Sequence, residues 1–208
     1  MKKSQIELWM LSKFAILFFI LALAAFLFIV SETEKAGLCS TEAGAQSALV
    51  ANSINNVLNN PVEDQQVVVK LPSAITLGSG LSAYTINMTY IKQSNAPSII
   101  NVQTQSTTSV GCSSQKSVFF PNTIKVYFIP ASGGQIPSAN TNQMSLTAYP
   151  SSQNSPTRFI IIIKCTSKTQ AGRNYLFVIT CAQTDASLCY GYGIYNPGST
   201  INNLCGFS

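Results

Sequence analysis

The sequence contains no histidine and has few charged residues. Only 9% of its 208 residues are charged, whereas about a quarter are charged in a typical soluble domain. Without histidine, neither a Ser-His-Asp nor a Cys-His nucleophile can be assembled, and no metal site with a histidine ligand can form. We therefore expect no catalytic residue, no metal site and no cofactor.

Acidic residues are scarce and unevenly placed. The chain has seven, of which six lie in the first 64 residues and only Asp185 lies further on. A mechanism that needs an acid and a base at one site requires two carboxylates, which the C-terminal two-thirds cannot supply. That region carries eight Lys or Arg, and only Lys164, Lys168 and Arg173 cluster, which argues against a nucleic-acid groove. We expect neither an enzyme nor a nucleic-acid-binding protein.

One long apolar run lies near the start of the chain. Residues 14–30 contain no polar side chain, and these seventeen residues would cover roughly 25 Å as a helix. The turns from Leu8 onward bring the length close to the hydrocarbon thickness of a bilayer, ~30 Å. Trp9 and Lys13 lie at the border, where an indole and a snorkelling lysine suit the headgroup level. The run predicts one transmembrane helix in contact with membrane lipid.

The charges around this run predict its orientation. Lys2, Lys3 and Lys13 precede it, whereas Glu32, Glu34 and one lysine follow it. The positive-inside rule then places the N-terminus in the cytoplasm and the rest outside the cell. A cleaved secretory signal shares this layout, but it needs a shorter core and small residues at a cleavage site, which are missing after Val30. We favour a retained, single-pass anchor in the cell membrane.

The segment after the anchor has helical periodicity. Pro61, after Asn59 and Asn60, is expected to end this helix, which otherwise runs from about Ile6 to Leu58. Gly37 and Gly44 each disfavour a helix by about 1 kcal/mol relative to alanine, so we expect a bend or short break near them. The apolar stripe repeats every three or four residues: Ala43, Ser47, Val50, Ile54, Val57 and Leu58.

From Gln65 the periodicity is that of β-strands. The pair at 158–165 and 175–181 is the most convincing hairpin, and its apolar content predicts central strands. Eight or nine short strands in about 145 residues are typical of an antiparallel β-sandwich or a small barrel. The expected strands are 66–71, 84–91, 98–104, 117–120, 124–129, 144–149, 158–165, 175–181 and 190–195.

The predicted fold class is α+β with a lollipop architecture. A long N-terminal helix, first transmembrane and then amphipathic, is followed by an antiparallel all-β, sandwich-like head. Residues 1–13 form a short basic leader and cytoplasmic flank, 14–30 the membrane or filament-core helix, 31–60 the helical stalk, and 61–208 the extracytoplasmic head.

The strand at 84–91 contains the sequon Asn87-Met88-Thr89. Tyr84, Ile86 and Met88 share one face, so Asn87 falls on the opposite, solvent side. Asn87 is therefore a candidate N-glycosylation site. An ordinary polar strand face is the alternative.

Six cysteines follow the anchor and predict three disulfides, because the segment is expected outside the cytoplasm. There is no CxxC pair, which excludes zinc ribbons and thioredoxin-like sites. Pairing of Cys165 with Cys181 is disfavoured by distance, and Cys39 is expected to fix the stalk to the head. Small buried thiols are the alternative. The candidates are Cys39, Cys112, Cys165, Cys181, Cys189 and Cys205, and the last three are expected to tie down the C-terminal fifth.

The order of these parts resembles the archaeal type IV pilin-like proteins with a class III signal peptide. The resemblance covers about residues 1–90. It rests on the short basic leader, Gln5-Ile6-Glu7, the hydrophobic helix with its Ala-rich continuation, Leu71-Pro72 and Tyr84-Thr85-Ile86. It implies a prepilin peptidase cut ahead of the apolar segment, which then packs into a filament core. The cut usually follows a small residue. A cut between Ser4 and Gln5 makes Glu7 third, and one after Lys2 makes it fifth.

Two roles stay open for Glu7, and two functions for the chain. Glu7 either forms an ion pair between subunits, as the resemblance implies, or is a wetted acid near Lys3. The first function is a non-enzymatic surface structural protein that assembles with copies of itself or other pilin-like subunits. The small side chains for close helix packing are Ala15, Ala22, Ala24 and Ala25, although no GxxxG is present.

The second function is a monomeric, membrane-tethered adhesion module for a surface glycan or protein ligand. Its platform would be the aromatic run at 190–195, where glycines leave the ring faces open. Alternating rings packed inward in a strand are the alternative for that run.

Overall fold

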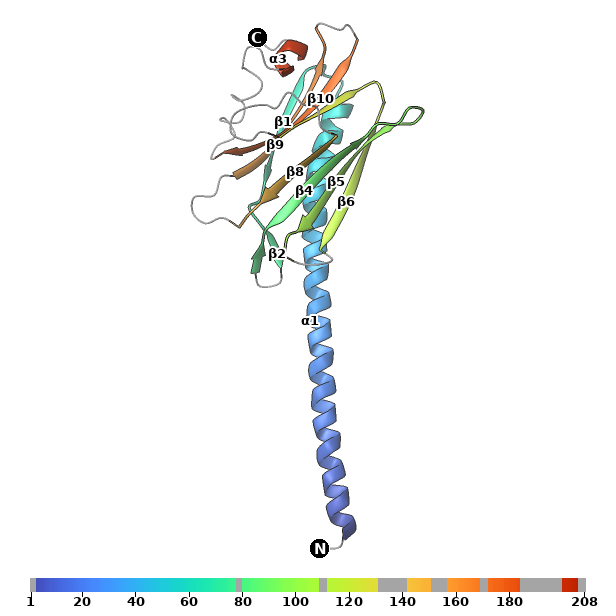
Figure 1. Cartoon of the computed structure of the whole chain (residues 1–208), viewed down its shortest axis with the longest axis vertical. Coiled ribbons are helices and arrows are strands. Elements are labelled where there is room, and N and C mark those ends of the chain that lie inside the picture. Colours follow the sequence, from blue (N-terminus) through green and yellow to red (C-terminus); the bar gives the residue numbers. More distant parts are fainter. Residues whose placement is uncertain are drawn as a thin grey trace.

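The computed structural model describes residues 3–77, 80–108, 112–130, 142–150, 157–168, 172–183 and 200–205. It confirms a long N-terminal helix followed by a β region in which antiparallel pairs dominate, an α+β chain. In Figure 1 the first half of helix α1 extends away from the β region, and its second half lies against the strands.

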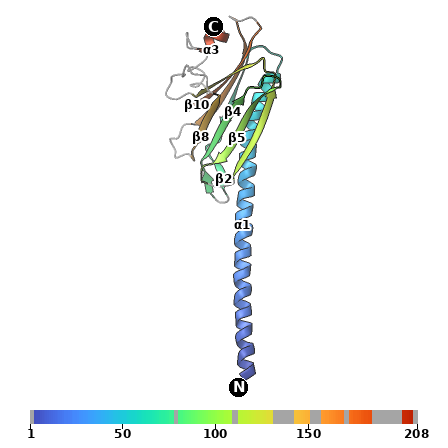
Figure 2. The same cartoon turned by 45° about the vertical axis from the view of Figure 1, so that its right-hand side comes forward.

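Helix α1 (Lys3–Asn59) runs through 57 residues without interruption, so the break or bend expected near Gly37 and Gly44 was wrong (Figures 1 and 2). The hydroxyl of Thr41 donates to the Gly37 carbonyl at 2.9 Å, inside the helix. A Cβ at position 44 would lie 3.4 Å from Ser114 Oγ, an ordinary van der Waals contact, so Gly44 faces β6 at a position where an alanine would also fit. A propensity cost of about 1 kcal/mol per glycine is thus too small to break a helix that is buried against the β region from Cys39 onward.

The predicted apolar stripe of α1 is confirmed as the surface that contacts the β region. Ala43, Val50 and Ile54 have no exposed area. Ser47 is equally buried, and its Oγ donates to the Ser114 carbonyl at 3.0 Å and lies 2.9 Å from Thr104 Oγ1. Because a buried hydroxyl with partners costs little, a serine fits in this otherwise apolar stripe.

Ten strands are described, and eight of the nine expected strands are among them. The short hairpin of β2 and β3 was missed, because three-residue strands leave no readable alternation. The expected strand at 190–195 lies outside the described residues. The strands are β1 (Gln65–Leu71), β2 (Ile75–Leu77), β3 (Gly80–Ser82), β4 (Tyr84–Ile91), β5 (Ser98–Ser106), β6 (Ser113–Phe120), β7 (Lys125–Pro130), β8 (Gln143–Ala148), β9 (Thr157–Thr166) and β10 (Asn174–Gln183).

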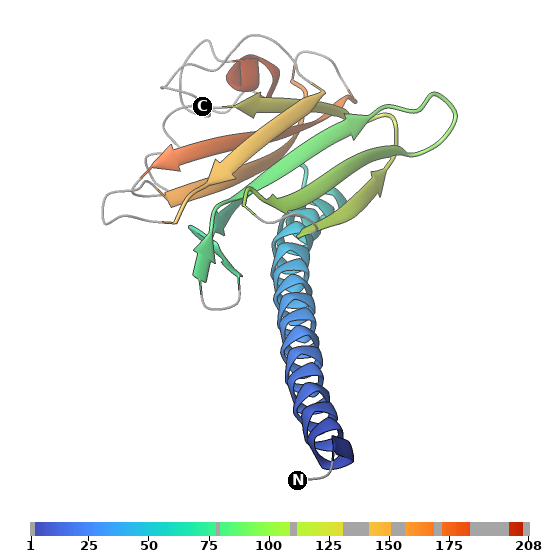
Figure 3. The ribbon, with the colours of Figure 1, turned by 60° about the horizontal axis from the view of Figure 1, so that its bottom comes forward.

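The strands form two four-stranded sheets and the β2–β3 hairpin. Their orders are β1-β9-β10-β7 and β6-β5-β4-β8, and Figure 3 shows both sheets beside the C-terminal part of α1. β9 and β10 form the predicted antiparallel hairpin at the centre of their sheet. The all-antiparallel expectation was wrong for one pair, since β10 runs parallel to β7. A parallel pair needs a long crossover, and residues 131–173, which contain β8 and β9, provide it.

The β1-β9-β10-β7 sheet is buried on both faces. One face packs with α1 and the other sheet in a common core that includes Ile54, Ile100 and Ile162. The opposite face packs with Ile201 of the short helix α3 (Thr200–Cys205) in a second cluster. Burial on both faces explains why residues 159–163 are apolar without alternation.

Two disulfides join distant parts of the chain, and their positions match two expectations. Cys39 is bonded to Cys112, with Cα atoms 5.6 Å apart, so the stalk is fixed to the head as predicted. Cys165 is bonded to Cys205 rather than to Cys181, because Cys165 and Cys181 stand at opposite ends of the β9–β10 ladder. Cys181 is disulfide-bonded too, and Cys189 lies outside the described residues.

Two polar contacts that the sequence did not reveal fix the ends of the buried part of α1. Near Cys39, the Thr76 backbone N–H donates to Glu42 Oε2, which ties the β2–β3 hairpin to the helix. At the other end, Lys164 Nζ donates to the carbonyls of Leu58 and Asn60 at 3.3 and 2.7 Å. The last turn of α1 has no basic residue of its own, so β9 supplies the cation that a helix C-terminus favours.

Replacing Lys164 by methionine should lower the free energy of unfolding by about 1–2 kcal/mol, because two helix-end carbonyls lose a charged donor. Lys70→Met is the matched control, since Lys70 is exposed on the neighbouring strand β1. Denaturant unfolding of both variants in detergent measures the difference. Equal losses in the two variants would show that Lys164 does not cap α1.

Tyr84 is buried where β4 begins. Its hydroxyl donates to the Pro72 carbonyl at 2.6 Å, and burial raises the pKa of this hydroxyl above its ordinary value. Because the folded-state pKa exceeds the unfolded value of about 10, the stability it contributes is complete below that pH. It is lost as pH rises from there towards the folded pKa.

We expect Tyr84→Phe to flatten the loss of stability above pH 10. The wild type should lose up to about 1.4 kcal/mol per pH unit more than the variant, the linkage limit for one proton. At pH 7 the variant should be less stable by about 1 kcal/mol, the value of one hydrogen bond. Urea unfolding between pH 8 and 11 measures both. Ile100→Val is the control, since it costs a similar amount without removing a titrating group. Identical alkaline slopes in wild type and Tyr84→Phe would refute the prediction.

Candidate functional site: the exposed apolar half of helix α1

The N-terminal half of α1 exposes large apolar side chains on every side. Those between Trp9 and Ile29 are 48–74% exposed, and Phe18 reaches 72%. A helix that is apolar all round is normally buried in a protein core or in a membrane, and isolated exposed patches on soluble monomers are much smaller. This segment therefore requires an apolar environment that the described part of the chain does not supply.

The segment is long enough and apolar enough to cross a membrane. Its best window has a mean hydropathy of 3.0, and none of that window is buried. Single-pass membrane anchoring is therefore consistent with the structure. At the N-terminal border, Lys13 Nζ lies 4.8 Å from the centre of the Trp9 ring, a cation–π contact that suits the interfacial position predicted for both residues.

A short polar section of α1 separates the apolar half from the β region. Glu32 and Lys35 form an exposed pair 2.9 Å apart, one turn along the helix. Such exposed pairs contribute little stability, so this pair marks a wetted section rather than a binding site. Cys39, the next buried residue, begins the contact with the β region.

Three of the predicted assembly residues share one side of α1. At 3.6 residues per turn, Ala15, Ala22 and Ala25 fall within an arc of about 80°, which we call the alanine side. Ala43 follows Ala25 by five full turns and is buried against the β region. By this spacing, the alanine side continues along the helix the side of α1 that packs against the head.

The remaining predicted site residues are only partly described. Ser4, Gln5 and Glu7 lie within α1, but their side chains are outside the described part, so the processing site and the two roles of Glu7 stay predictions. Asn87 is half-buried on the side of β4 away from the core, where the sequence placed it. Among the described residues no group of three His, Cys, Asp or Glu could hold a metal ion.

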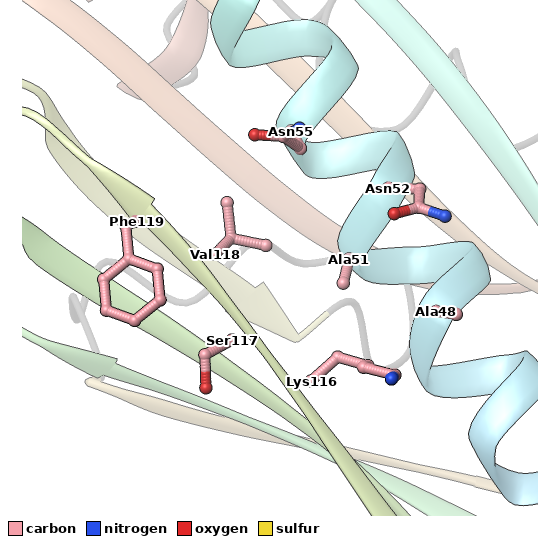
Figure 4. A pocket seen from close by; sticks show the side chains of 8 residues that line it. All are labelled: Ala48, Ala51, Asn52, Asn55, Lys116, Ser117, Val118 and Phe119. Atoms are coloured by element: carbon pink, nitrogen blue, oxygen red, sulfur yellow. The ribbon is translucent and has the colours of Figure 1, made fainter.

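A groove of about 500 Å³ lies between α1 and the edge strand β6. Figure 4 shows Ala51 and Asn55 of α1 facing Val118, while Phe119 points away from the helix. Among the described residues that line the groove, Lys116 is charged and none is a carboxylate. These residues therefore provide no acid–base pair. Among its described lining residues, none indicates a particular ligand.

Comparisons of the chain with family models, with curated proteins and with solved structures found no match in any of the three. Its function is therefore inferred from its residues and their geometry.

Proposed function

We propose that this chain is a non-enzymatic, pilin-like structural protein of the cell surface. One observation carries the proposal: the exposed apolar half of α1 continues without interruption into the half that is built into the β region. Because α1 is continuous between its two halves, the position of the anchored half fixes the position of the head. In this proposal the sandwich-like head is held away from the membrane by the helix.

The apolar half of α1 serves two purposes in this proposal. As a monomer in the membrane, it is covered by lipid. In an assembly, the same residues contact helices of other copies, and alanines let the backbones approach closely. Because the alanine side lies below the head, a neighbouring helix that packs there sits beneath this head. Neighbouring subunits are then displaced along the helix axis, as a filament requires.

The head lies outside the cell in this proposal. Two disulfides within the described residues fit an oxidising compartment, since the cytoplasm keeps thiols reduced. The lysines before the apolar run favour the same orientation. Lys2 and Lys3 then remain in the cytoplasm, unless a peptidase removes them.

Electron microscopy of material sheared from the cell surface, with mass spectrometry of the filaments, tests the assembly. We expect filaments that contain this chain, and their absence from cells that lack the gene. N-terminal sequencing of the native protein gives the second readout. A terminus after Ser4 or Lys2 supports processing and assembly. A retained Met1 on a protein that is never found in filaments would instead indicate the monomeric, membrane-tethered module. The aromatic run of that alternative, residues 190–195, lies outside the described residues.

A further inference from the structure

Among the described residues, the side of the β6-β5-β4-β8 sheet that points away from the core carries no charged residue. We call this side the outer face. Its opposite side is mostly apolar, and Ile86, Met88 and Ile100 on it are fully buried. Strand register arranges the neutral polar residues of the outer face in three rows of four, none of them fully buried. The rows are Thr147-Thr85-Gln105-Ser113, Ser145-Asn87-Gln103-Gln115 and Gln143-Thr89-Asn101-Ser117.

A fourth row of the outer face is apolar. It consists of Ile91, Ile99 and Phe119 in register, and the Phe119 side chain is 63% exposed. The four strands span roughly 14 Å, at ~4.8 Å per neighbour, and the three polar rows cover a similar length. The outer face is thus a neutral area of hydroxyl and amide groups bordered by an apolar row that contains one aromatic ring.

Asn87 lies in the middle row, on one of the two central strands. Neighbouring polar groups are partly satisfied by one another, since Ser117 Oγ donates to Asn101 Oδ1 at 2.7 Å and the hydroxyls of Thr85 and Thr147 are 3.1 Å apart. Within the described part of the chain, the Asn87 amide has no such side-chain partner. Its Nδ2 is therefore available for reaction.

The sequon geometry is complete on this face. Asn87 and Thr89 stand on the same side of β4, about 7 Å apart along the strand, while Met88 between them is buried in the core. Both sequon side chains are thus accessible together in the folded head. The alternation of the strand, and not a loop, presents them.

We propose that Asn87 carries an N-linked oligosaccharide that lies along the outer face. In the transfer, Asn87 Nδ2 displaces the phosphate of an activated oligosaccharyl phosphate or diphosphate. The sugar C1–N bond forms and the C1–O bond breaks. The phosphate leaves with the bonding electrons, and the amide nitrogen gives up one proton to a base of the transferase.

Neutral sugars are the chemistry that fits this surface. Asn, Gln, Ser and Thr side chains both donate and accept hydrogen bonds, as sugar hydroxyls do, and a face without charge imposes no desolvation cost for ions. Phe119 offers a ring for the apolar side of a sugar. A charged glycan or a charged protein surface would find no partner among the fifteen outer-face positions.

Peptide mass spectrometry of the protein purified from its own cells tests the attachment. We expect the peptide that contains Asn87 to carry the mass of a glycan, and Asn87→Gln and Thr89→Ala to lose it. Two controls are matched to these variants. Thr89→Ser keeps a sequon and should keep the glycan, and Asn101→Gln removes an outer-face asparagine that is not in a sequon and should change nothing.

Hydroxyl-radical footprinting tests where the glycan lies. Labelling of Phe119 and Ile99 should rise in Asn87→Gln relative to the glycosylated protein, because the glycan no longer covers the fourth row. Unmodified Asn87 in the native protein would overturn the proposal, and unchanged labelling on glycan loss would overturn its location on the face. The inference rests on the proposed external head, which is checked separately: oxidised cysteines with an unmodified Asn87 refute only the glycan, whereas reduced cysteines refute the external placement.

Discussion

Replacing Leu21 and Leu23 together by arginine should remove the protein from the membrane. On biological insertion scales, leucine at the centre of a span is favourable by about 0.5 kcal/mol and arginine unfavourable by about 3 kcal/mol, so the pair costs roughly 7 kcal/mol. Both side chains are exposed, at 58% and 48%, and contact no part of the β region. The loss therefore falls on membrane insertion and not on packing of the head. Alkaline extraction of isolated membranes followed by sedimentation measures it.

The control uses the same chemistry on the same helix outside the apolar run. Leu38 and Leu49 are 60% and 42% exposed, and their double replacement by arginine should leave the protein in the membrane pellet. If Leu21→Arg with Leu23→Arg also stayed in the pellet, the apolar half of α1 would not be the anchor, and the proposed function would lose its main support.

Removing the Cys39–Cys112 disulfide by alanine substitution should lower the free energy of unfolding by about 4 kcal/mol. The bond closes a loop of 73 residues, and in the chain-entropy treatment a loop of this length restricts the unfolded state by about that amount. Guanidinium unfolding in detergent, with and without reducing agent, measures the loss. The reduced wild type should be less stable than the alanine variant without reducing agent, because reduction also opens the Cys165–Cys205 bond.

Location distinguishes this disulfide from the second one. Amide hydrogen exchange in residues 36–45 of α1 should accelerate when the Cys39–Cys112 bond is absent, because Cys39 begins the contact between α1 and the β region. The Cys165→Ala/Cys205→Ala variant lacks the bond that closes a loop of 40 residues. It should lose a similar free energy of unfolding, since the loop-closure entropy depends on the logarithm of loop length. Its exchange in 36–45 should stay unchanged. Equal exchange in both variants would contradict the role of Cys39 as the link.

Local periodicity accounts for the elements that were predicted correctly. The three-and-four spacing of Ala43, Val50 and Ile54 correctly predicted the buried side of α1. Alternation in 84–91 placed Met88 in the core and Asn87 outside. The errors have physical causes as well. Glycine propensity predicted a break in α1, but a local cost of about 1 kcal/mol per glycine is small beside the burial of Ala43, Val50 and Ile54 against the β region.

The sequence alone determined that the chain begins with a long apolar helix, continues with a strand-rich remainder, and contains no histidine and only seven acidic residues. These properties depend on composition and on the spacing of neighbours along the chain. Only the tertiary structure decided which strands are adjacent. It set β10 parallel to β7, joined Cys165 to Cys205, aligned Asn87 with Gln103 and Ser145, and brought Lys164 to the end of α1. Each of these contacts joins residues far apart in sequence, and their pairing follows from how the sheets and helix bury a common core.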